Sequence, residues 1–79
     1  MKDEHIVLLY VDGTIDGMMW GFSARDYDWS FMVAENEHAQ PVFREHMSIT
    51  EPMHLADVSG VIANCKSRYW ASKGKGKYS

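Results

Sequence analysis

The sequence lacks several features that define common classes of small protein. Its single cysteine, Cys65, cannot form a disulfide within the chain, which excludes the disulfide-rich secreted scaffolds and a cysteine-based zinc site. The longest apolar run, residues 6–11, is far shorter than the roughly 20 residues of a membrane-spanning helix. It is also too short for the apolar region of a signal peptide. We therefore expect a reduced, cytoplasmic protein that has no membrane partner.

The sequence also lacks the motifs of catalysis. It has no nucleophile elbow, no phosphate-binding glycine loop and no closely spaced pair of histidines on a predicted helix. Cys65 falls on an apolar helical stripe, where a thiol is usually an inert hydrophobic group. We expect neither enzyme activity nor a cofactor. A small enzyme or a metal site built from His38, His46 and His54 is an alternative that the spacing alone does not remove.

What the sequence does contain is an ordinary globular composition in 79 residues, 46% of them hydrophobic and 24% charged. A chain of this length forms one domain at most. We expect residues 1–72 to form a single domain. We expect residues 73–79, which alternate lysine with glycine up to residue 77, to be a flexible basic tail.

The first half of the chain predicts antiparallel strands. Residues 4–11 are apolar on both faces, and Asp12-Gly13 follows them, which is a strong signal for a two-residue hairpin turn. That turn would gather apolar side chains into two sets, one on each face of the hairpin. One set is Ile6, Leu8, Tyr10, Ile15 and Met19, and the other is Val7, Leu9, Val11, Met18, Trp20 and Phe22. Gly17 and Gly21 suggest a bulge or a close backbone approach in the second strand.

The middle of the chain predicts at least one more strand. Tyr27, Trp29, Phe31 and Val33 alternate with smaller or polar residues, which is the period of a strand with an aromatic face. Residues 41–49 suit either a short helix or a fourth strand, and the strand is favoured.

The last third predicts one long helix. Thr50 is a plausible N-cap, with Glu51 and Pro52 in the first turn. The apolar positions that follow are spaced three and four apart and form one stripe: Leu55, Val58, Ile62, Cys65 and Tyr69. Lys73 suits the last turn, and Gly60 suggests that another element approaches the helix closely. The predicted fold class is α+β, a small antiparallel meander of three to four strands with one C-terminal helix packed on one face.

Charge is distributed unevenly along the chain, whose net charge is −3. All eleven acidic residues lie within residues 1–63, whereas residues 64–79 carry five basic residues and no acid. Apolar side chains are too many for one helix to cover. We therefore predict a non-catalytic protein-binding module with a basic partner surface. The residues predicted to bind the partner are Asp26, Asp28, Trp20, Trp29 and Met18.

The charge pattern suits a small acidic inhibitor of a host nucleic-acid-handling protein, of the kind that phages and mobile elements encode. In that case the host cytoplasm would be its location. The alternative is direct nucleic-acid binding, which the acidic body disfavours, through cations and an aromatic residue of the C-terminal segment: Lys66, Arg68, Trp70, Lys73, Lys75 and Lys77. An exposed strand edge makes a homodimer a further alternative.

Overall fold

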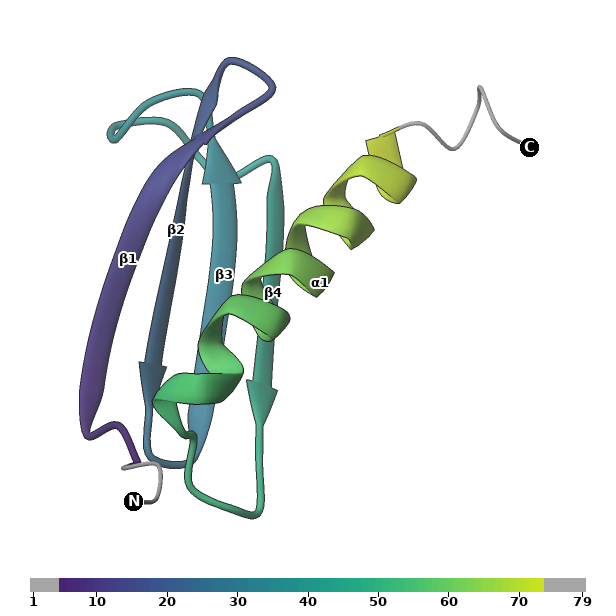
Figure 1. Cartoon of the computed structure of the whole chain (residues 1–79). Coiled ribbons are helices and arrows are strands. Elements are labelled where there is room, and N and C mark those ends of the chain that lie inside the picture. Colours follow the sequence, from purple (N-terminus) through teal and green to yellow (C-terminus); the bar gives the residue numbers. More distant parts are fainter. Residues whose placement is uncertain (1–4, 74–79) are drawn as a thin grey trace.

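The computed structural model describes residues 5–73, which form a four-stranded antiparallel sheet and one helix (Figure 1). The strands lie in the order in which they occur in the chain: β1 (Leu8–Ile15), β2 (Met18–Arg25), β3 (Asp28–Ala34) and β4 (Phe43–Ser48). Helix α1 (Leu55–Lys73) runs diagonally across one face of this sheet. The predicted α+β meander is confirmed, and residues 43–48 are its fourth strand.

The first hairpin turns at Asp16-Gly17, so the prediction of a turn at Asp12-Gly13 was wrong. Asp16 has a φ of 56° and Gly17 a φ of 77°, as a two-residue turn of this kind requires. Both Asp-Gly pairs carry the same local signal. A turn at residues 16–17 lets Leu8–Ile15 pair along its whole length with Met18–Arg25, and this longer ladder decides between the two.

Although the turn lies four residues later than predicted, most side chains of the hairpin remain on the face that was predicted for them. The register moves by an even number of residues, so most side chains keep their predicted face. There are exceptions: Ile15 pairs with Met18 and is buried on the side of the helix, away from Tyr10. Before β1, Ile6 is buried in the core and Val7 is 72% exposed, so the predicted faces of these two residues were also wrong. Gly21 pairs in regular register without a bulge, and its close neighbour is a side chain: a Cβ there would lie 2.8 Å from the Tyr10 hydroxyl.

The two faces of the sheet differ in what covers them. We call the side beneath α1 the covered face and the opposite side the open face. The open face carries the even-numbered residues of β1, β3 and β4 and the odd-numbered residues of β2. The core lies between the covered face and α1, where the most deeply buried large side chains are Phe22, Phe31, Val33 and Cys65.

Strand β3 follows the predicted alternation. Trp29, Phe31 and Val33 are buried on the covered face, and the Trp29 ring centroid lies 5.8 Å from that of Phe22. Tyr27 precedes the strand and is 55% exposed, so its inclusion in the aromatic face was wrong. Its carbonyl instead accepts a hydrogen bond from the Ile49 backbone N–H at 2.9 Å, which ties the chain after β4 to the turn between β2 and β3.

Helix α1 begins at Leu55, so the prediction of an N-cap at Thr50 was wrong. The Met53 N–H donates to the Asp26 carbonyl at 2.8 Å, and the Met53 carbonyl accepts from the Ile6 N–H at 2.7 Å. These bonds hold the backbone before the helix in an extended conformation. Leu55 is 62% exposed and is not part of the buried stripe. The rest of the predicted stripe is confirmed: Val58, Ile62, Cys65 and Tyr69 are all buried.

The C-terminal half of α1 is fastened to the β1–β2 turn. The Tyr69 hydroxyl donates to Asp16 Oδ2 at 3.0 Å, and the Lys73 ammonium forms an ion pair with the same carboxylate. Lys73 is therefore the last residue of the helix, whereas the predicted tail had begun there; residues 74–79 lie outside the described residues. Within residues 5–73, no helix has the length and apolar character needed to cross a bilayer.

Candidate functional site

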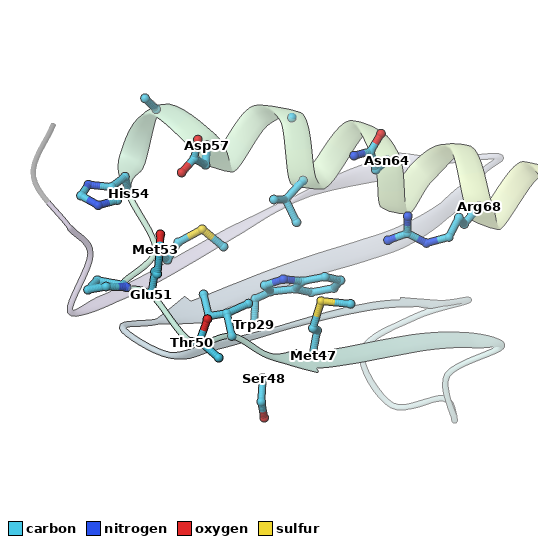
Figure 2. Close-up of a pocket in the computed structure, with 15 residues that line it drawn as sticks. Trp29, Met47, Ser48, Thr50, Glu51, Met53, His54, Asp57, Asn64 and Arg68 are labelled. Atoms are coloured by element: carbon cyan, nitrogen blue, oxygen red, sulfur yellow. The ribbon is translucent and has the colours of Figure 1, made fainter.

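A groove of about 840 Å³ runs between the first part of α1 and strand β4 with the loop that follows it (Figure 2). It exists because the chain after β4 does not turn directly into the helix. Residues 49–54 first pass along the β2–β3 turn, to which the Ile49 and Met53 N–H groups are hydrogen-bonded. The start of the helix is therefore held away from β4. The groove is therefore bordered by an edge strand on one side and a helix on the other.

The floor of the groove is apolar. Trp29 and Met47 are cross-strand partners on β3 and β4, and Figure 2 shows their side chains beneath the helix. Trp29 is only 5% exposed, whereas Met47 is 50% exposed. Val61 of the helix is half-buried and also lines the groove. Met47 therefore offers a flexible apolar surface that nothing within residues 5–73 covers fully.

The helix side of the groove is wide at Gly60. A Cβ placed on Gly60 meets no atom within 4 Å, so the prediction of a close approach at this position was wrong. The glycine faces open space in the groove instead. Asn64, one turn further along the helix, lines the same wall.

The two ends of the groove differ in charge. At one end, the Arg68 Nε–H donates to both carboxylate oxygens of Glu45, at 2.9 and 2.8 Å. These hydrogen bonds are the main reason that the pKa of Glu45 is lowered from its usual value. At the other end lie Glu51 and Asp57, both exposed, and neither has an ion-pair partner among residues 5–73. The groove is thus neutralised at Arg68 and negative at its loop end.

Two predicted partner-binding carboxylates lie close to the negative end. Asp28 pairs in register with Ser48, which lines the groove, and the Asp26 backbone carbonyl holds Met53, another lining residue. The Asp26 carboxylate lies 3.5 Å from the His5 imidazole. The β2–β3 turn therefore adds negative potential beside the groove without forming part of its wall.

The other predicted partner-binding residues are distributed differently. Trp29 forms part of the groove floor. Trp20 is 7% exposed in the core, with the Lys66 ammonium 4.4 Å from its ring centroid. Met18 is half-buried in a separate hollow of about 310 Å³ between Phe43 and the end of α1. The structure brings Asp26 and Trp29 to the region of the groove, whereas Asp28 lies at the same end of the sheet but on the open face, and Trp20 and Met18 lie elsewhere.

Three of the five cations proposed for nucleic-acid binding, those on α1, already have partners within the protein. Lys66 lies over Trp20, Arg68 binds Glu45 and Lys73 binds Asp16. Trp70 is 46% exposed and packs edge-on against Tyr69, with ring centroids 5.3 Å apart. Lys75 and Lys77 lie outside the described residues. The helical cations are thus engaged with carboxylates or a ring, which weakens the case for a phosphate-binding surface on α1.

The histidines and the cysteine do not assemble into a reactive site. His38 lies in the β3–β4 loop, His46 on the open face of β4, and His54 directly before α1. Across residues 5–73, no group of three or more His, Cys, Asp or Glu side chains is placed to hold a metal ion. Burial, followed by the charge of Glu45, raises the pKa of the Cys65 thiol to about 11, so it is not an activated nucleophile.

Sequence reasoning missed the groove because its two walls are far apart in the chain. One signal was available: Asp57, Val61, Asn64 and Arg68 are spaced four, three and four apart and form a second stripe beside the buried one. That stripe marks a helical face distinct from both the core and the solvent side. The pairing of Trp29 with Met47, which creates the floor, depends on strand register and has no local signature.

No family model, no curated protein and no solved structure matches this chain. The function proposed below rests on the shape and the charge of the groove and on the edge strand beside it.

Proposed function

We propose that this protein is a non-catalytic protein-binding domain that receives an extended, basic segment of another protein in the groove between α1 and β4. The observation that supports this most directly is the combination of an apolar floor, a negative end and an edge strand in one place. Each of these three features selects for a different property of the bound segment.

The edge strand selects for an extended backbone. Within residues 5–73, β4 pairs with β3 on one side only, so its other side presents backbone N–H and C=O groups that no described strand pairs with. A segment that adds to this edge as a fifth strand would gain main-chain hydrogen bonds, which is a recurring mode of peptide recognition. β4 is six residues long, and alternate residues direct their N–H and C=O groups to this edge.

The floor and the negative end select for side chains. In a paired strand, alternate side chains point to the same face. One set would therefore lie on the groove side next to Met47, where an apolar side chain displaces water from the exposed thioether. Lysine or arginine at the loop end would meet Glu51 and Asp57, with Asp26 and Asp28 adding long-range attraction.

The same geometry supports an inhibitory role. Basic segments of nucleic-acid-handling proteins bind phosphates, and a domain that occupies such a segment would compete with the nucleic acid. We propose that this acidic protein acts in this way in the cytoplasm. Small inhibitors encoded by phages or mobile elements would suit this role.

The test uses two labelled peptides of equal length, one alternating leucine with lysine and the other alternating leucine with glutamate. We expect the full-length protein to bind the lysine peptide in a fluorescence anisotropy titration, with affinity that falls as salt is added. Replacing both Glu51 and Asp57 by lysine should weaken binding by about tenfold or more.

The matched control replaces Glu35 and Glu37 by lysine, because both lie in the β3–β4 loop at the opposite end of the sheet. The net charge is the same in the two variants. An equal loss of affinity in both would show that binding follows net charge alone and would overturn the groove as the site. Tighter binding of the glutamate peptide would overturn the proposal altogether.

A further inference from the structure

The open face of the sheet carries large side chains that no element within residues 5–73 covers. Leu8 and Tyr10 of β1 are 64% and 63% exposed, and Met19 and Met32 on the central strands are 39% and 43% exposed. Apolar surface of this kind on a flat sheet is a common feature of association surfaces. The charged residues between these side chains indicate which partner fits.

The charges on the open face are arranged in two rows that cross the sheet. The strand register places Asp12 on β1 and Arg44 on β4 in one row, with Gly21 and Met32 between them. A second row holds Arg25 on β2 beside Asp28 on β3. The midline of the sheet runs between β2 and β3. In each row, an acidic residue on one side of this midline has a basic residue at the same distance on the other side.

This arrangement is self-complementary. We propose that the open face is the interface of a symmetric homodimer, in which two copies stack face to face about a two-fold axis that runs along the strands between β2 and β3. That rotation lays β1 of one copy over β4 of the other, and each row of one copy faces the same row of the other. Asp12 then faces Arg44 of the second copy, and Arg25 faces its Asp28, each contact occurring twice.

The apolar side chains fit the same arrangement. Tyr10 leans over Gly21, where its hydroxyl would lie 2.8 Å from a Cβ, so the face has no deep hollow near its centre. In the stacked dimer, Met32 of one copy lies over Gly21 of the other and packs against the tilted Tyr10 ring. Contacts between a methionine sulfur and an aromatic ring are favourable. A two-fold axis across the strands would instead place Met19 over Arg25 and Asp12 over Tyr10. Charged side chains would then face apolar or aromatic ones, so this second arrangement is less favourable.

The size of the open face allows only a small interface. Four strands about 4.8 Å apart and about eight residues long give a face of roughly 500 Å² in each copy. Two copies would bury about 1,000 Å², at the lower limit of specific interfaces. We therefore expect a dissociation constant of about 10 to 100 µM, so the dimer forms only at high concentration.

The test is sedimentation equilibrium of the full-length chain from about 1 µM to about 1 mM, which brackets the expected constant. Asp12→Arg and Arg44→Asp should each weaken association by about tenfold or more, because each places like charges opposite one another twice. The double variant Asp12→Arg/Arg44→Asp should restore association to within about threefold of the wild type. Asp12 and Arg44 are on opposite edges of the same sheet, so an intramolecular contact does not explain that rescue.

The control for Asp12→Arg is Glu35→Arg, which raises the net charge equally in a loop outside the open face and should leave association unchanged. A monomer at every concentration would overturn the proposal. So would association that survives the single reversals, or single losses that the double variant does not restore. Neither Asp12 nor Arg44 lines the groove, so these outcomes are independent of the peptide-binding test.

Discussion

The two faces of this sheet are both rich in large apolar side chains, but these side chains are buried on one face and exposed on the other. On the covered face, Phe22, Phe31 and Val33 have at most 1% of their surface exposed, because α1 packs over them. On the open face, Tyr10 and Met32 are 63% and 43% exposed. The difference shows that apolar character along a strand does not say which side holds the core. The position of a single helix makes that choice.

The two faces also treat charge differently. The covered face has one charged residue, Glu45, and both of its carboxylate oxygens accept from the Nε–H of Arg68. The open face carries Asp12, Arg25 and Arg44 exposed to solvent, where charges are hydrated and need no partner in the monomer. A partly buried carboxylate is acceptable only with its hydrogen bonds satisfied, whereas exposed charges remain available for association.

The largest expected difference between the faces comes from neighbouring residues on β3. Phe31→Ala should lower the free energy of unfolding by about 3 to 5 kcal/mol, because it leaves a cavity beneath α1. Met32→Ala, one position further and on the open face, should cost less than about 1 kcal/mol. Urea unfolding at low micromolar concentration, followed by circular dichroism, measures both. Equal losses would mean that the open face is as buried as the core even in the dilute protein.

A smaller effect on stability distinguishes two glycines on the side of the sheet where α1 lies. Gly60 borders the open groove, whereas Gly13 lies against the Trp20 side chain. Gly60→Ala should raise the free energy of unfolding by about 0.5 to 1 kcal/mol, because alanine favours the helix and its Cβ meets nothing within 4 Å. Gly13→Ala should instead lower it by about 1 to 3 kcal/mol, since that Cβ would lie 2.9 Å from the buried Trp20 indole nitrogen. Thermal unfolding of the two variants measures the contrast. A destabilised Gly60→Ala variant would show that the groove wall is tighter than its geometry indicates.

The smallest effect concerns pH and the pair on the covered face. The hydrogen bond from Arg68 lowers the pKa of Glu45 below its usual 4.5. The resulting stability is therefore fully present above the unfolded value and is lost as the pH falls through the lower folded value. Glu45→Gln should remove at most about 1 kcal/mol at pH 7, because Arg68 is half exposed, and should flatten the acid dependence of unfolding. Urea unfolding from about pH 7 to about pH 3 measures this slope. Glu35→Gln in the β3–β4 loop is the control, and an equal change there would contradict the role of the pair.

Much of the fold could be predicted because its signals are local. The alternation of Trp29, Phe31 and Val33 gave a strand with a buried aromatic face, and the spacing of Val58, Ile62, Cys65 and Tyr69 gave the helix. The errors arose where two local signals were equal or where distant segments intervened. Asp12-Gly13 and Asp16-Gly17 are the same dipeptide, and only the pairing of the full strands distinguishes them.

The candidate site could be predicted only in part. Trp29 and the nearby Asp26 and Asp28 were among the residues expected to bind a partner, and that function stays a prediction. Met47, Gly60 and Asp57 were not expected, because they come from β4 and α1 and meet across a groove that neither element indicates alone. Trp20 has the same residue type as Trp29, yet it lies in the core beneath Lys66.

By itself, the sequence determined an α+β meander, a helix with one buried stripe and an excess of apolar side chains, because the periods of strands and helices are properties of neighbouring residues. The tertiary structure alone decided which turn closes the first hairpin, where α1 begins, and that a groove lies on one side of the sheet and an uncovered face on the other. Those choices depend on register and on backbone bonds between distant segments, such as those of Met53 with Ile6 and Asp26. Contacts between distant segments are set by the packing of the whole chain, and no short stretch of residues encodes them.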